Sequence, residues 1–265
     1  MAYLEWGEAH NPDVVICVHG LTRCARDFDN LARALCGRYR VVCPDVAGRG
    51  DSEWLADAML YQIPQYVSDM VTLVARLDVE RVQWVGTSMG GLIGMALAAQ
   101  KGSPVAKLVL NDAGPVVAKA ALERIGQYVG QSPSFPSIEA AEKVMRAVSA
   151  PFGPHTDAQW RFLTEVVLRK NTDGSWRLHY DPKIAEPYRK HMPDKDLEMW
   201  ELWDAVACPT LVIRGAQSDL LTRETAQAMT ERGPRAKLVE LPGIGHAPTL
   251  LHADQIAVVR EFLLA

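Results

Sequence analysis

The sequence has no run of about 18 consecutive apolar residues, the length that a membrane-spanning helix needs. Its first ten residues, MAYLEWGEAH, contain neither the basic segment nor the apolar core of a secretory signal. We therefore expect a cytoplasmic protein that has no membrane partner.

The sequence also lacks a strong excess of charge of either sign. Its 28 basic and 32 acidic side chains leave a formal net charge of −4. No basic field is available to attract nucleic acid, and the acidic excess is too small to indicate a cationic partner. We expect a protein that binds a small molecule, and the composition leaves the oligomeric state open.

Cysteine pairs and metal-binding motifs are missing as well. The five cysteines are odd in number, and none of them forms a CxxC pair. No HExxH motif or Cys/His cluster is present, so we expect neither a metal nor another cofactor. A chain of 265 residues buries roughly 70–75% of its unfolded surface on folding, so its core needs no disulfide or metal to be stable.

What is present is a series of short apolar runs rich in Val, Ile and Leu. Such runs are typical of parallel strands that are buried on both faces. Six of them stand out: Val14–Gly20, Tyr39–Asp45, Val82–Ser88, Lys107–Asp112, Thr210–Gly215 and Lys237–Gly243. The segment AYLEWGE near the start is a candidate edge strand.

Amphipathic segments of helical length alternate with these runs. They cover Asp27–Cys36, Pro64–Asp78, Thr222–Gly233 and Asp254–Leu264. Alternating strands and helices predict an α/β fold with a mostly parallel, doubly wound sheet. From Gly114 to about Ala207 the pattern shows helical segments and no convincing strand. We therefore predict a core made of residues 1–113 and 208–265, with a helical cap insertion at 114–207.

One glycine-rich junction carries a candidate nucleophile. Residues Gly86–Gly90 read GTSMG and lie between a predicted strand and a predicted helix. A G-x-S-x-G sequence at such a turn is typical of a nucleophile elbow, in which flanking glycines let the backbone expose the serine. A serine alone is a poor nucleophile, so Ser88 needs a base and an orienting acid.

Loops at the carboxyl ends of neighbouring strands provide candidates for both partners. His246 follows the last predicted strand and is the candidate base. Two aspartates qualify as the acid: Asp219, after the penultimate strand, and Asp112, after the strand that precedes the insertion. Asp219 completes the chain order Ser–Asp–His, and we prefer it, with Asp112 as the alternative acid.

An ester-cleaving serine also needs donors for the oxyanion of the tetrahedral intermediate. The Met89 amide directly follows the serine at a helix N-terminus. The second candidate is the Leu21 amide, in the HGLTR segment (His19–Arg23) after the first central strand. Arg23 lies beside this turn, and both a position in the site and a solvated position stay open for it.

Together these segments resemble the α/β-hydrolase superfamily over nearly the full length of the chain. HGLTR, PDVAGRGDS, GTSMGG, RGAQSDLL and GIGHAP occur in the family's order. The resemblance implies Ser88 as nucleophile, Asp219 as acid, His246 as base, and a helical cap in the place of the insertion. The GRGDS run (Gly48–Ser52) is interpreted as an ordinary loop after a strand.

The predicted function is hydrolysis of a small or medium carboxylic ester or lactone through an acyl-enzyme, as in carboxylesterase-like or enol-lactonase-like members of the superfamily. Three alternatives use the same framework. A cofactor-free peroxidase or dioxygenase keeps the Ser/His/Asp set, and so does a carbon–carbon bond hydrolase. A non-catalytic small-molecule-binding protein of the same fold is the third.

Overall fold

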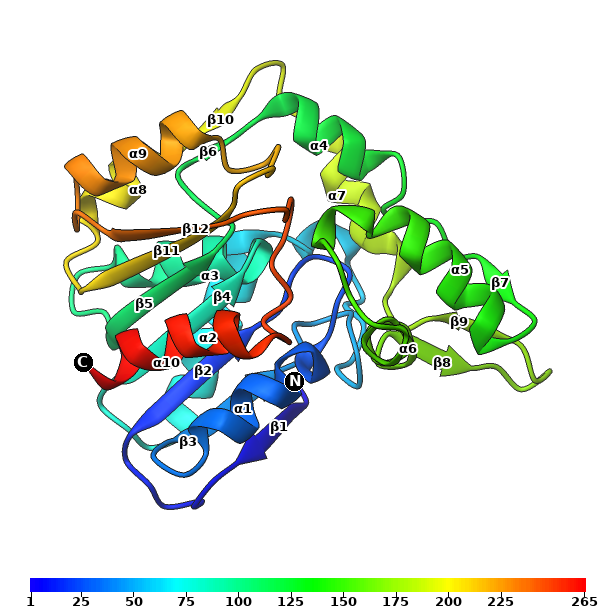
Figure 1. The fold of residues 1–265 in the computed structure, drawn as a ribbon, viewed down its shortest axis with the longest axis horizontal. Helices are drawn as coiled ribbons and strands as arrows, with labels where there is room; N and C mark the ends of the chain where they lie inside the picture. Colours follow the sequence, from blue (N-terminus) through cyan, green and yellow to red (C-terminus); the bar gives the residue numbers. More distant parts are fainter.

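A single seven-stranded sheet forms the centre of the computed structural model, which describes residues 1–265 (Figure 1). Its strand order is β1-β3-β2-β4-β5-β11-β12. The bounds are β1 Tyr3–Trp6, β2 Val14–Val18, β3 Arg40–Pro44, β4 Val82–Thr87, β5 Val105–Asn111, β11 Thr210–Gly215 and β12 Lys237–Leu241. Only the edge strand β1 is antiparallel to its neighbour. The predicted mostly parallel sheet is confirmed.

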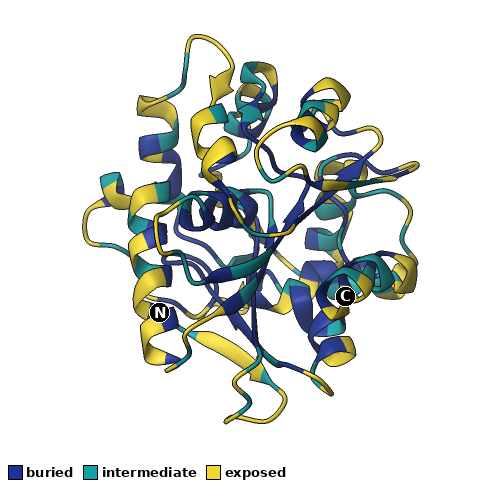
Figure 2. Cartoon of the chain, turned by 90° about the vertical axis from the view of Figure 1, so that its left-hand side faces the viewer, coloured by how far each residue is buried: buried dark blue, intermediate teal, exposed yellow.

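Helices cover both faces of this sheet and explain why its central strands are apolar throughout. Every residue of β2 and of β11 is buried, whereas β1 is largely exposed (Figure 2). Helices α1 (Asp29–Leu35) and α10 (Ala253–Leu264) pack on one face. Helices α2 (Ile63–Arg76), α3 (Met89–Ala98) and α9 (Arg223–Glu231) pack on the other face. The sheet is therefore doubly wound, as predicted. No helix is both long and apolar enough to cross a membrane.

The segment between β5 and β11 holds the remaining α-helices and strands, most of which lie to the right of the sheet in Figure 1. Its helices are α4 Lys119–Gly126, α5 Ile138–Val148, α6 Asp157–Glu165, α7 Ala185–Lys190 and α8 Trp200–Ala205. Short 3-10 turns occupy Ala25–Phe28, Ala58–Leu60, Ala150–Phe152 and Pro182–Ile184. The start of α6 has a capping box between Thr156 and Gln159, which fixes where that helix begins.

The segment also contains strands, which the sequence pattern did not indicate. They are β6 Val116–Val117, β7 Ser134–Phe135, β8 Leu168–Lys170, β9 Trp176–Leu178 and β10 Leu197–Glu198. They form one two-stranded and one three-stranded sheet. Strands of two or three residues are too short for an alternating pattern to emerge. Helix α6 ends at Glu165, and β8 begins three residues later at Leu168.

The junction between β4 and α3 depends on close contact between backbones. A Cβ on Gly86 would lie 2.2 Å from the Gly90 carbonyl oxygen, and a Cβ on Gly90 would lie 2.0 Å from the Val18 carbonyl oxygen. Ser88 between them has φ 52° and ψ −115°. Such a conformation costs a non-glycine residue about 1–3 kcal/mol, so the surrounding packing must hold it.

We expect Gly90→Ala to lower the free energy of unfolding by about 1–3 kcal/mol or more, because the clash is with backbone and cannot be relieved by a rotamer change. Gly37→Ala is the matched control, since a Cβ there meets nothing within 4 Å. Urea unfolding of the two variants measures the difference. Equal stabilities would contradict the close-approach argument.

Candidate active site

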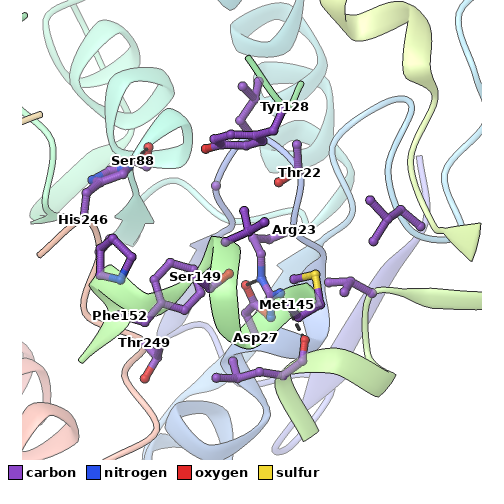
Figure 3. A pocket seen from close by; sticks show the side chains of 18 of the residues that line it. Thr22, Arg23, Asp27, Ser88, Tyr128, Met145, Ser149, Phe152, His246 and Thr249 are labelled. Atoms are coloured by element: carbon purple, nitrogen blue, oxygen red, sulfur yellow. Dashed lines mark hydrogen bonds and ion pairs between the residues drawn. The ribbon is translucent and has the colours of Figure 1, made fainter. Parts of the chain in front are cut away.

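Three side chains from three loops form a hydrogen-bonded chain at the carboxyl ends of the strands. The Ser88 hydroxyl lies 2.9 Å from His246 Nε2, and His246 Nδ1 lies 2.7 Å from Asp112 Oδ2. Nδ1–H donates to the carboxylate in this arrangement, which leaves the Nε2 lone pair to accept from the serine hydroxyl. Figure 3 shows Ser88 and His246 together at one side of the cavity.

Asp112 is fully buried and accepts three hydrogen bonds. Its Oδ1 accepts from the Gly215 amide at 3.0 Å, and its Oδ2 accepts from the Ser218 hydroxyl at 2.6 Å as well as from His246. The backbone of Asp112 adopts φ 54°, and its amide donates to the Ile213 carbonyl at 2.7 Å. The carboxylate is thus held between the end of β5 and the loop after β11.

Asp219 does not lie beside His246, so the preference for it is wrong in this structure. Its carboxylate accepts from Arg124 Nε at 2.6 Å and from Arg124 Nη2 at 2.9 Å, and about half of its side chain is exposed. The neighbouring Ser218 points inward to Asp112, and Asp219 faces outward toward α4. The alternative acid, Asp112, is the carboxylate that reaches the histidine.

The two amides predicted as oxyanion donors lie near the serine with their N–H groups free. Gly20 passes so close that an added Cβ would lie 3.7 Å from Ser88 Cβ, which brings the Leu21 peptide to the site. The Leu21 amide donates to no group of the protein. Met89 is the first residue of α3, so its amide has no partner within the helix.

Arg49 is a buried cation that contacts both of these residues, and the sequence pattern did not single it out. Its Nε donates to the Leu21 carbonyl at 2.8 Å, and its Nη2 lies 3.7 Å from Met89 Sδ. Its guanidinium also packs over the rings of Tyr61 and Tyr66. It belongs to the GRGDS run, whose interpretation as an ordinary loop missed this contact. A charged residue between two glycines in the loop after a strand was the available signal.

His19 ties the same loop to its neighbour and is not a titrating base. Its Nδ1 donates to the Gly20 carbonyl at 2.7 Å, and its Nε2 accepts from the Val46 amide at 3.0 Å. Complete burial lowers the pKa of His19 to about 3. The imidazole therefore stays neutral and holds the turn that carries Leu21.

A cavity of about 180 Å³ opens over Ser88. Half of its 28 lining residues are hydrophobic, and they come both from the core loops and from the segment between β5 and β11 (Figure 3). Arg23 lines it but is paired with Asp27 and donates to the Leu163 carbonyl at 3.0 Å. No group of three or more His, Cys, Asp or Glu side chains is arranged to hold a metal ion.

Comparison with known proteins places this arrangement in a family. The model of the "Alpha/beta hydrolase family" matches residues 15–259, and the chain belongs to that family. It is 55% identical over 269 residues to the 3-hydroxybutyrate-oligomer hydrolase of Cupriavidus necator, covering 99% of this chain and 92% of that protein. It is 24% identical to Esterase YbfF of Escherichia coli, over 96% of this chain and 94% of that protein.

The solved structures agree with this assignment. An alpha/beta hydrolase from Novosphingobium aromaticivorans superposes with a TM-score of 0.89 at 41% identity. The match covers 99% of this chain and 93% of that one. The predicted α/β-hydrolase fold is confirmed.

The neutral His19 makes stability depend on pH. The unfolded chain takes up a proton at this histidine below about pH 6.5, whereas the folded protein does so only near pH 3. Its contribution to the free energy of unfolding therefore falls as pH is lowered through that window, by at most about 1.4 kcal/mol per pH unit. We expect His19→Gln to lose stability less steeply than the parent between pH 6.5 and 4. Urea unfolding at several pH values measures this, and parallel pH profiles would contradict it.

Proposed function

We propose that this protein is a serine hydrolase that cleaves short carboxylic esters through an acyl-enzyme, and that oligomers of 3-hydroxybutyrate are its substrate class. The hydrogen-bonded chain from Ser88 through His246 to Asp112 is the observation that carries the chemistry. The relative that is 55% identical over almost the whole chain is named for the substrate class. The prediction of an enzyme that acts on ester bonds is confirmed by such relatives.

In the first step His246 Nε2 takes the Ser88 proton as the serine oxygen attacks the ester carbonyl. The imidazole becomes positive, and the buried Asp112 carboxylate stabilises it through the bond to Nδ1. His246 then gives the proton to the leaving alcohol oxygen. Water, activated by the same nitrogen, attacks the acyl-enzyme and releases the acid.

Negative charge on the tetrahedral oxygen needs donors that are already aimed at it. We assign this role to the Leu21 and Met89 amides, and removal of one such donor typically costs about 3–4 kcal/mol of transition-state stabilisation. Arg49 is assigned as their positioning residue, because it holds the Leu21 carbonyl and contacts Met89. The positive charge of Arg49, buried next to these two residues, also favours a negative charge near their amides.

The cavity supports a chain-like substrate that is partly apolar. Residues of the segment between β5 and β11, such as Met145 and Phe152, face Ser88 across it. We propose that residues 114–207 act as a cap on a core of 1–113 and 208–265. Methyl branches of a hydroxybutyrate chain fit such a lining, while its ester groups find polar neighbours such as Thr22 and Thr249.

The other chemistries that share a Ser/His/Asp set have less support. The intact hydrogen-bonded chain, including an acid that is buried and triply bonded, argues for a catalytic rather than a purely binding protein. Among catalytic functions, the names of the relatives favour esters over carbon–carbon bonds and over oxygen chemistry. Lactones contain the same acyl–oxygen bond and remain within the proposed class.

We expect Ser88→Ala to abolish hydrolysis of the 3-hydroxybutyrate dimer and of p-nitrophenyl butyrate. We expect Asp112→Asn to lower kcat by about 10³–10⁴-fold, because the imidazole loses its orienting acceptor. Asp219→Asn is the matched control and should be at least about a hundredfold more active than Asp112→Asn on the p-nitrophenyl ester. Steady-state kinetics and unfolding curves of the three variants are the measurements. Turnover retained in Ser88→Ala, or the reverse order of the two aspartate variants, would contradict the assignment.

A further inference from the structure

The cap helix α4 places a second ionic group at the cavity that contains Ser88. Arg124 lies in the last turn of α4 and lines this cavity. It is bound by Asp219 of the loop after β11. Asp219, which the family resemblance implied as the acid, is therefore paired with Arg124 instead of His246. The function of this ion pair remains to be explained.

Asp219 occupies only one edge of the Arg124 guanidinium. The two bonds are Nε to Oδ2 at 2.6 Å and Nη2 to Oδ1 at 2.9 Å, which together fill the side edge. A guanidinium has five N–H groups, and its end edge offers one donor from each terminal nitrogen. The Tyr128 hydroxyl is the one other group that interacts with the Arg124 guanidinium, and no carboxylate of the protein binds its end edge. A planar carboxylate matches such an edge with two parallel hydrogen bonds.

Arg23, the other arginine that lines the cavity, lacks this freedom. Its Nε and Nη2 are bound by Asp27, and its Nη1 donates to the Leu163 carbonyl. Arg23 is buried, whereas Arg124 keeps 37% of its side chain exposed. Arg23 therefore fastens α6 to the core loop, and Arg124 is the arginine that has donors available for a ligand.

Tyr128 adds a neutral donor to the same wall. It lies one helical turn beyond Arg124 and lines the cavity close to Ser88, as Figure 3 shows. Burial raises the pKa of Tyr128, so its hydroxyl remains protonated at neutral pH and can donate a hydrogen bond. An arginine edge and a phenol on one wall form a polar end in a cavity whose lining is otherwise half hydrophobic.

We infer that Arg124, oriented by Asp219, binds the free carboxylate of an ester substrate that is itself an acid. The inference rests on the proposed esterase function and names a subsite for it. A linear 3-hydroxybutyrate oligomer ends in one free carboxylate, and this end group distinguishes it from a neutral alkyl ester. The carboxylate anchors the chain at the Arg124 end of the cavity while Ser88 attacks an internal ester bond.

The test compares the 3-hydroxybutyrate dimer with the same dimer whose carboxylate is replaced by a primary amide. Both contain a single ester bond, and only one is charged. We expect the wild-type protein to prefer the acid in kcat/KM by about tenfold or more, mostly through KM, since a charge-assisted bidentate contact is lost with the amide. In Arg124→Gln the acid-to-amide ratio is expected to fall to about one. Arg124→Lys, which keeps the charge but not the two-donor edge, should give an intermediate ratio.

Lys119→Gln is the matched control. It removes the same charge from the same helix, but Lys119 pairs with Glu123 and does not line the cavity. We expect it to leave the acid-to-amide ratio unchanged. A ratio that falls equally in Lys119→Gln would assign the preference to long-range charge and overturn the subsite.

Two further results would also overturn the inference. The first is a wild-type acid-to-amide ratio of kcat/KM near one, and the second is an equal loss of kcat/KM on the two dimers in Arg124→Gln. Either result would mean that Arg124 only holds α4 against Asp219, and the esterase function would be unaffected. Absence of turnover of every ester by the wild-type protein would instead refute the proposed function, and this subsite with it. Hydrolysis of the neutral p-nitrophenyl ester by the wild-type protein distinguishes these cases, because it requires the esterase function and not the carboxylate subsite.

Discussion

The buried carboxylate of Asp112 is the group on which the rest of the site depends. An unpaired carboxylate inside a protein is very unfavourable, so its bonds to Gly215, Ser218 and His246 are required as well as useful. These partners come from different loops. The hydrogen bonds to the Asp112 carboxylate therefore hold the end of β5, the loop after β11 and the loop after β12 together. The histidine is oriented by the same bonds that make burial of the acid possible.

The serine is coupled to this carboxylate through the backbone. The Ser88 amide donates to the carbonyl of Asn111, the residue directly before Asp112. Ser88 and Asp112 are thus held by adjacent strands, β4 and β5, whose register fixes their separation. Rigid strand ends of this kind keep a catalytic arrangement in place without help from a ligand. On the other side of Ser88, Arg49 and His19 fix the loop that bears Leu21.

Much of this architecture could be predicted from local pattern. Buried parallel strands are continuous apolar runs, so all six predicted runs contain a strand, and the glycines around Ser88 indicated the elbow. The acid was different. Asp112 and Asp219 follow adjacent strands, and chain order fits both of them. The two aspartates differ only in where their side chains point. Ser218 binds Asp112 and Arg124 binds Asp219, and each of these contacts joins residues that lie far apart in the sequence.

Other features depended on long-range contacts in the same way. The GRGDS run shows a charged residue between two glycines, but the contacts of Arg49 with Leu21 and Met89 exist only in the folded chain. The two- and three-residue strands between β5 and β11 form by pairing with distant residues, so they carry no local signal. The cavity is lined both by core loops and by the segment between β5 and β11. The periodicity of apolar residues predicts single elements and does not predict how distant elements pack against each other.

In this structure Asp112, and not Asp219, is the hydrogen-bond partner of His246. Proton NMR of ¹⁵N-histidine-labelled protein observes the Nδ1–H of His246 directly, with His246→Gln to assign the resonance. We expect a strongly downfield resonance that persists in Asp219→Asn and is lost or moved upfield in Asp112→Asn, because a charged acceptor deshields the bridging proton. A resonance that persists in Asp112→Asn and is lost in Asp219→Asn would contradict it.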